Sequence, residues 1–146
     1  MDRREARQFE WPVLMAIIGI LAFLLLGALE DLQAEFEDAA MQSEAAALRV
    51  ELLDRLAHHQ SVGGPLPTSP NPLDWVERRP EKYLGALDAP PAAGGVWYFD
   101  RRRSELVYAY RSGREARFRL VRGAAAGEVK GSLGGVGLQR VGGSGN

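Results

Sequence analysis

The chain has 146 residues with 18 basic and 19 acidic side chains, and it contains no cysteine. This length allows one membrane segment and one small domain, and the lack of cysteine excludes disulfides, thiolate catalysis and cysteine-ligated zinc. Residues 1–70 carry 5 basic and 11 acidic side chains, whereas residues 71–146 carry 13 and 8. An acidic N-terminal part therefore precedes a basic C-terminal part.

The first strong feature is an uncharged apolar run from Trp11 to Leu29. A helix needs about 20 apolar residues to cross the ~30 Å hydrocarbon core of a bilayer, so we predict a transmembrane helix over residues 11–29. We expect Pro12 in its first turn, where the missing N–H costs little. The run is longer than the apolar core of a signal peptide and no small-residue cleavage site follows it, so we expect the anchor to be retained.

Three arginines before the run predict its orientation. Arg3, Arg4 and Arg7 precede it, whereas the next basic residue after it is Arg49. The positive-inside rule therefore places residues 1–10 in the cytoplasm and the rest of the chain on the other side of the membrane.

Apolar and small side chains repeat at alternating spacings of three and four through the following segment, residues 30–60. This heptad seam consists of Leu29, Leu32, Phe36, Ala39, Ser43, Ala46, Val50, Leu53 and Ala57. Its a/d pattern predicts a helical stalk with coiled-coil character, continuous with the membrane helix. The seam is rich in alanine, and two partners stay open for it: the head domain and neighbouring subunits, including a second copy of the chain.

His58 and His59 close the predicted helix, where the helix dipole favours them. No cysteine and no histidine at i,i+4 spacing accompanies them, so we predict no metal site.

Glycine and proline in the linker, residues 61–72, separate the stalk from a small head, residues 73–141. A short helix is predicted at Leu73–Arg78, and Trp75, Val76, Tyr83 and Leu84 are expected to pack beneath a sheet. The tail, residues 142–146, has the composition of a disordered segment.

The strand signals in the head predict an antiparallel β-meander. Runs rich in β-formers cover Val96–Phe99, Leu106–Tyr110 and Arg117–Val121, and polar turns separate them. Either Glu128–Leu133 or Leu138–Val141 would extend the sheet. Because three strands make a marginal core, we expect the head to dock onto the stalk helix.

The segment Ala16–Ala22, AIIGILA, resembles the N-terminal helix of type IV pilins and type II secretion pseudopilins, which commonly reads FTLIELMVVIAIIGILA. This resemblance places Glu10 on the family's acidic residue, which helps to seat an incoming subunit against the N-terminal amine of its neighbour. It also implies an α+β, pilin-like fold with a long helix and a β-rich head. The head segments NPLDWVERRPEKYLG and GGVWYFDRRRSELVY resemble accessory proteins of mannose-sensitive haemagglutinin (MSHA) pilus biogenesis.

The chain departs from this family at the processing site. Glu5 and Ala6 stand where the family has the glycine and phenylalanine that flank the cleaved bond. We therefore expect an accessory protein that stays in the bacterial inner membrane with its head in the periplasm. The alternative is a true minor pilin or pseudopilin that is processed at an atypical site.

Seven arginines of the head form a candidate basic face for partner binding. They are Arg101, Arg102, Arg103, Arg111, Arg114, Arg117 and Arg119. Interleaved aromatic residues make nucleic acid one candidate partner, as in a DNA-binding pilus-tip module. We favour a solvated face balanced by Asp100, Glu105 and Glu115, or a face that meets the acidic stalk of a neighbouring subunit.

No catalytic or phosphate-binding motif is recognisable in the sequence, so we predict neither enzyme activity nor a cofactor. The predicted function is that of a single-pass, pilin-like component of a type IV pilus or type II secretion-type assembly. Its expected partners are other pilus or secretion-system subunits, the inner membrane and a homo-oligomer through the helix. The residues expected to act in assembly are Glu10, Leu29, Leu32, Phe36, Val50 and Leu53.

Overall fold

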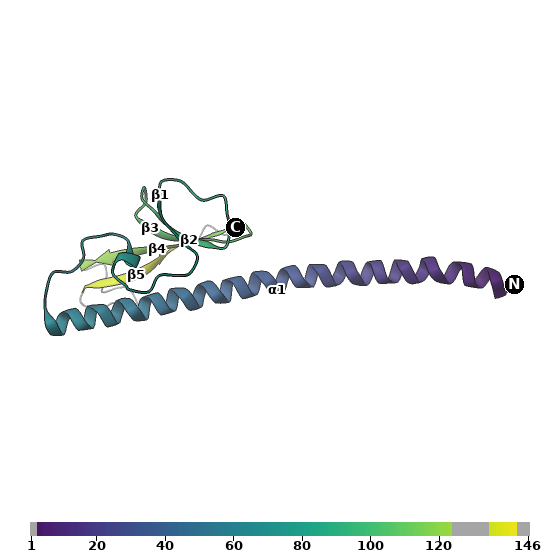
Figure 1. The fold of residues 1–146 in the computed structure, drawn as a ribbon, viewed down its shortest axis with the longest axis horizontal. Coiled ribbons are helices and arrows are strands. Elements are labelled where there is room, and N and C mark those ends of the chain that lie inside the picture. Colours follow the sequence, from purple (N-terminus) through teal and green to yellow (C-terminus); the bar gives the residue numbers. More distant parts are fainter. Residues whose placement is uncertain (1–2, 124–134, 143–146) are drawn as a thin grey trace. The chain divides into compact units, whose positions relative to one another are not determined.

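The structure, a computed structural model, describes residues 3–123 and 135–142 (Figure 1). The chain divides into two units, Met1–Asp38 and Ala39–Asn146. Helix α1, Arg3–Val62, contributes to both units. The division falls inside the predicted stalk, so the second part of the stalk belongs to the same compact unit as the head.

In the first unit, α1 begins well before the apolar run. Pro12 lies inside the helix, so the prediction that Pro12 marks the first turn is wrong. The physical reason is the composition of residues 3–8, in which arginine, glutamate, alanine and glutamine are all good helix formers.

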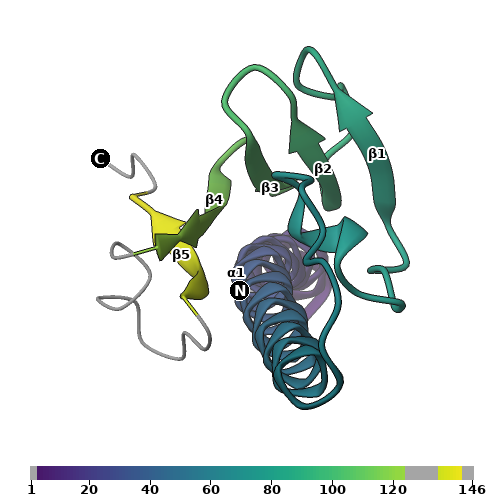
Figure 2. The same cartoon turned by 90° about the vertical axis from the view of Figure 1, so that its left-hand side faces the viewer.

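The second unit contains the end of α1, a 3₁₀ helix and a five-stranded sheet. The 3₁₀ helix η1 spans Pro72–Asp74, and the strands are β1 (Tyr83–Leu87), β2 (Val96–Asp100), β3 (Glu105–Ala109), β4 (Glu115–Arg122) and β5 (Val136–Val141). The strands lie side by side in the order β1-β2-β3-β4-β5 (Figure 2). Strand β1 is parallel to β2, and the other neighbours are antiparallel. The α+β arrangement and the antiparallel meander are therefore confirmed.

Two sequence predictions near the C-terminus have different outcomes. Strand β5 includes Leu138–Val141, one of the two segments proposed to extend the sheet. The other, Glu128–Leu133, lies outside the described residues, as does nearly all of the predicted disordered tail.

One face of α1 packs against one face of the sheet. The buried helix residues are Met41, Ala45, Leu48, Leu52 and Leu56. They share a core with the buried sheet residues Trp97, Phe99, Leu106, Tyr108, Ala116, Phe118, Val136 and Leu138. The indole N–H of Trp97 also donates a hydrogen bond to Glu44 of α1. The expectation that the head docks onto the stalk helix is confirmed.

The segment between α1 and the sheet closes one end of this core. Trp75 and Val76 are buried, as predicted, but only Pro72–Asp74 is helical, and as a 3₁₀ turn. Asn71 caps this turn, since its Oδ1 accepts from the N–H of Leu73 at 3.1 Å. The hydrogen bonds of the Asn71 cap stabilise a single 3₁₀ turn. The chain then continues to β1, so the predicted helix does not form beyond Asp74.

Strand β1 was not predicted from the sequence. Tyr83 packs against the core as expected, whereas Leu84 is 49% exposed, because successive side chains of a strand alternate between faces. The prediction that Leu84 packs beneath the sheet is therefore wrong. The connection 88–95 returns to β2, and Gly94 passes so close to the β3–β4 turn that a Cβ would lie 2.6 Å from the Cα of Arg111.

We expect Leu52→Ala to destabilise the second unit by about 2–5 kcal/mol, because it leaves a cavity at a side chain that is 2% exposed. Chemical unfolding of the detergent-solubilised full chain, followed by tryptophan fluorescence, measures this loss. The control is Val50→Ala on the other side of the same helix, which should change stability by less than ~0.5 kcal/mol. Equal losses for the two variants would contradict the assigned core face.

Candidate functional site

The apolar run of the first unit is a candidate membrane span. Within the described residues, α1 is one helix that is long and apolar enough to cross a membrane, by length and composition. Every side chain from Glu10 to Phe36 is exposed. Contact between apolar surface and water costs about 25 cal/mol per Å², so burial of this surface against lipid or protein would lower the free energy.

Glu10 lies at the N-terminal border of this run. It is exposed on α1 and directly precedes Trp11. If the run spans a membrane, a carboxylate at this place borders the hydrocarbon region, where charge is expensive unless it is paired or reaches the interface. Its predicted role in subunit assembly stays a prediction.

The heptad seam is not the face of α1 that packs against the head. Leu29, Leu32 and Phe36 in the first unit are 50%, 48% and 72% exposed. In the second unit Val50 is 66% exposed and Leu53 is partly buried. Of the two partners that the sequence left open, the head therefore occupies a different face of the helix.

The seven arginines of the predicted basic face are distributed over three places in the second unit. Arg101, Arg102 and Arg103 form the β2–β3 turn, and Arg111 and Arg114 lie in the β3–β4 turn at the other end of β3. Arg117 and Arg119 lie on β4 itself. Because successive hairpin turns lie at opposite ends of an antiparallel sheet, one continuous basic face does not form.

Several of these arginines have partners within the chain. Arg101 pairs with Asp88 at 3.3 Å, and the guanidinium of Arg114 lies 4.8 Å from the ring centre of Tyr110. The Asp100 carboxylate accepts from the N–H groups of Arg102 and Arg103, which holds the turn. The arrangement favours the interpretation as a balanced, solvated surface over a nucleic-acid interface.

Arg117 is the centre of an ionic network on the sheet face that does not contact α1. Its guanidinium lies 3.4 Å from Asp100 and 3.1 Å from Glu105, and it also pairs with Glu115. Glu105, whose side chain is 4% exposed, additionally pairs with Arg119 at 2.5 Å. A buried carboxylate is tolerated when it is paired and hydrogen-bonded, and Glu105 meets this condition.

Tyr98 completes this network. Its ring is 1% exposed, and its hydroxyl donates to Glu115 at 3.2 Å. Burial first, and then the neighbouring charge of Glu115, raise the pKa of Tyr98 to about 12. For Arg117, burial lowers the pKa, but hydrogen bonds to Glu115 and Glu105 outweigh it and the net direction is upward. The network therefore holds Arg117, whose side chain is 15% exposed, within the chain, whereas the paired Arg119 side chain remains 49% exposed.

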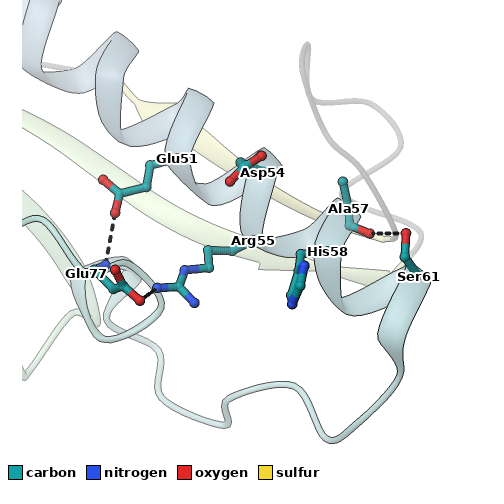
Figure 3. A pocket seen from close by; sticks show the side chains of 7 residues that line it. All are labelled: Glu51, Asp54, Arg55, Ala57, His58, Ser61 and Glu77. Carbon is teal, nitrogen blue, oxygen red and sulfur yellow. Dashed lines mark hydrogen bonds and ion pairs between the residues drawn. The ribbon is translucent and has the colours of Figure 1, made fainter.

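A recess of about 510 Å³ lies beside the C-terminal end of α1 (Figure 3). It is lined by Glu51, Asp54, Arg55, Ala57, His58, Ser61 and Glu77. Glu51 accepts from the N–H groups of Glu77 and Arg78 at 2.9 and 3.0 Å, and Arg55 pairs with Glu77. These contacts tie the segment after η1 to the helix, so Glu51, Arg55 and Glu77 already have a structural role.

The recess is lined by carboxylates and one histidine, but these side chains are not grouped as metal ligands. In residues 3–123 and 135–142, no group of three or more histidine, cysteine, aspartate or glutamate side chains is placed to hold a metal ion.

Comparisons of the chain with protein families, with curated proteins and with solved structures found no significant match.

We expect the second unit to lose stability as the pH rises from 10 through about 12. The pKa of Tyr98 is about 10 when unfolded and about 12 when folded. A raised folded pKa contributes stability that is fully present below the unfolded pKa and lost as the pH passes the folded pKa. Chemical unfolding of the full chain at several alkaline pH values measures this loss.

Tyr98→Phe is the control for this prediction. It removes the ionisable hydroxyl and keeps the ring, so the alkaline loss should shrink although a hydrogen bond worth about 1 kcal/mol is missing at neutral pH. Parallel losses in the wild type and in Tyr98→Phe between pH 10 and 12 would contradict the assignment to Tyr98.

Proposed function

We propose that this chain is a single-pass inner-membrane, pilin-like component of a type IV pilus (MSHA-like) or type II secretion-type assembly. It acts through helix packing in the membrane and protein–protein contacts in the periplasm. The observation that carries the proposal is one helix, α1, that begins with an exposed apolar run and ends beneath a small, mostly antiparallel sheet. This order matches the architecture implied by the resemblance of AIIGILA to the pilin helix.

In the proposed mechanism, successive segments of α1 make different contacts. Glu10 and the apolar run act in the membrane, where the carboxylate requires a cationic or hydrogen-bonding partner on another subunit. The exposed seam makes helix contacts above the membrane. The arginine-bearing turns at the two ends of the sheet lie outside the face that packs on α1, and they provide contacts to acidic surfaces of other subunits.

A true minor pilin or pseudopilin is the second candidate function. The placement of Glu10 favours it, whereas Glu5 and Ala6 at the expected cleavage position favour a retained N-terminus. The two candidates differ in covalent structure, because only a processed pilin has a shortened and methylated N-terminus.

We expect the full-length mass for protein extracted from membranes, both in a strain with prepilin peptidase and in a strain without it. Intact-mass spectrometry makes the measurement, and a known pilin of the same strains serves as the processing control. A shorter, methylated form only in the peptidase-containing strain would replace the accessory-protein proposal with the minor-pilin alternative.

We expect Glu10→Ala to impair assembly of the pilus or secretion machine without unfolding the second unit. The reason is that Glu10 lies in the first unit, far along the chain from the core of residues 39–141. Surface pili or secreted substrate measure assembly, and circular dichroism measures folding. The matched control is Glu30→Ala, which removes an exposed carboxylate at the other end of the apolar run. Normal assembly by Glu10→Ala would exclude the proposed role of Glu10.

A further inference from the structure

The sheet and the heptad seam use opposite sides of α1. If Leu29 is given heptad position a, the buried residues Met41 and Leu48 are at position f, Ala45 and Leu52 at c, and Leu56 at g. Positions f and c lie opposite the a/d side of a helix. The head therefore covers the c/f side of the second unit and leaves the a/d side uncovered.

The uncovered side carries no charge over almost three heptads. Its a and d residues in the second unit are Ala39, Ser43, Ala46, Val50, Leu53 and Ala57. All but the partly buried Leu53 are exposed. Small side chains at these positions allow close approach of another helix, and Val50 and Leu53 provide apolar surface to bury.

The charge pattern beside the seam fits a second copy of the same helix. The acidic residues of the segment are concentrated at positions b and c, which point away from the contact of a parallel two-stranded coil. They are Glu30, Asp31, Glu37, Asp38, Glu44 and Glu51. Two copies of this acidic segment can therefore approach without placing these carboxylates opposite each other.

The flanking e and g positions add one favourable pair. In a parallel dimer a g residue faces the e residue five positions later on the partner. Arg49 at g would face Asp54 at e of the second copy, and Glu35 at g would face the uncharged Ala40. Arg49 also lies 5.6 Å from the ring centre of Phe118, a core residue of its own head.

We propose that the a/d side of residues 39–57 is the contact face for a second copy of this chain, packed in parallel. This inference rests on the proposed membrane function, because anchoring by the same apolar run gives two copies the same direction and height. The sheet remains on the outer side of each helix in such a pair. The seam thus specifies self-association, while the arginine-bearing turns stay accessible to other subunits.

Single-cysteine cross-linking in native membranes tests this proposal, because the chain contains no other cysteine. Val50→Cys at a and Leu53→Cys at d should form disulfide-linked dimers under mild oxidation, since facing a or d residues approach disulfide distance. His58→Cys at b, an exposed position of the same helix, should not. Dimer formation by His58→Cys at an equal rate, or no product from Val50→Cys and Leu53→Cys, would overturn the proposal.

The mass of the product identifies the occupant. Twice the mass of the chain supports a second copy, whereas a product of another mass would mean that a different helix occupies the seam and would overturn the proposal. Adding Val50→Glu to Leu53→Cys should lower the dimer yield by about tenfold, because two unpaired carboxylates would then face each other. Since Val50 is exposed, unfolding of this variant should match that of the parent.

A separate measurement keeps this inference distinct from the proposed function. Membrane extraction and assembly of the machine are measured in the same strains. Absent dimers with normal assembly would overturn only the self-association, whereas a chain that is not held in the membrane would overturn the proposed function itself.

Discussion

The packing of one side of α1 against the sheet is the interaction on which the second unit depends. A small sheet buries too little apolar surface for independent stability. Leu48, Leu52 and Leu56 supply the second layer, and Trp97 of β2 lies in the facing sheet with its ring 5.1 Å from that of Tyr108. Helix α1 therefore contains both the candidate membrane-spanning run and one of the two layers of the core of the second unit.

The sequence predicted the elements of this core better than its contacts. The helix, the strands β2, β3 and β4 and the docking of the head on the stalk followed from periodicity and from the shortage of buried area. The face of α1 that packs on the head could not be predicted, because two sets of residues on this helix have helical spacing. Periodicity detects both sets but does not show which of them contacts the head. The stripe with Met41 and Leu52 is larger and more apolar than the seam with Ala46 and Ala57, so it gains more by burial.

Strand β1 and the ionic network show two further limits of reasoning from one sequence. Parallel neighbouring strands are usually joined by a crossover of about a dozen residues or more. The connection 88–95 is shorter than this, so a strand parallel to β2 is unusual at this place. Gly85 inside the strand, with a φ of 94°, weakened its signal further. The sequence identified Asp100, Glu105 and Glu115 as acids that balance the arginines of the head, but which arginine pairs with which acid follows only from the register of β2, β3 and β4.

The exposed seam offers only a small apolar area for helix association, and a membrane anchor would compensate for this. An alanine-rich seam buries little apolar area, so two free helices of this kind would associate poorly in solution. It also exposes little apolar surface when it is alone, which limits non-specific association. In the proposed dimer, anchoring would confine the two copies to one surface and one orientation, which raises their effective concentration. A contact that is too weak in solution would then suffice in the membrane and would remain reversible.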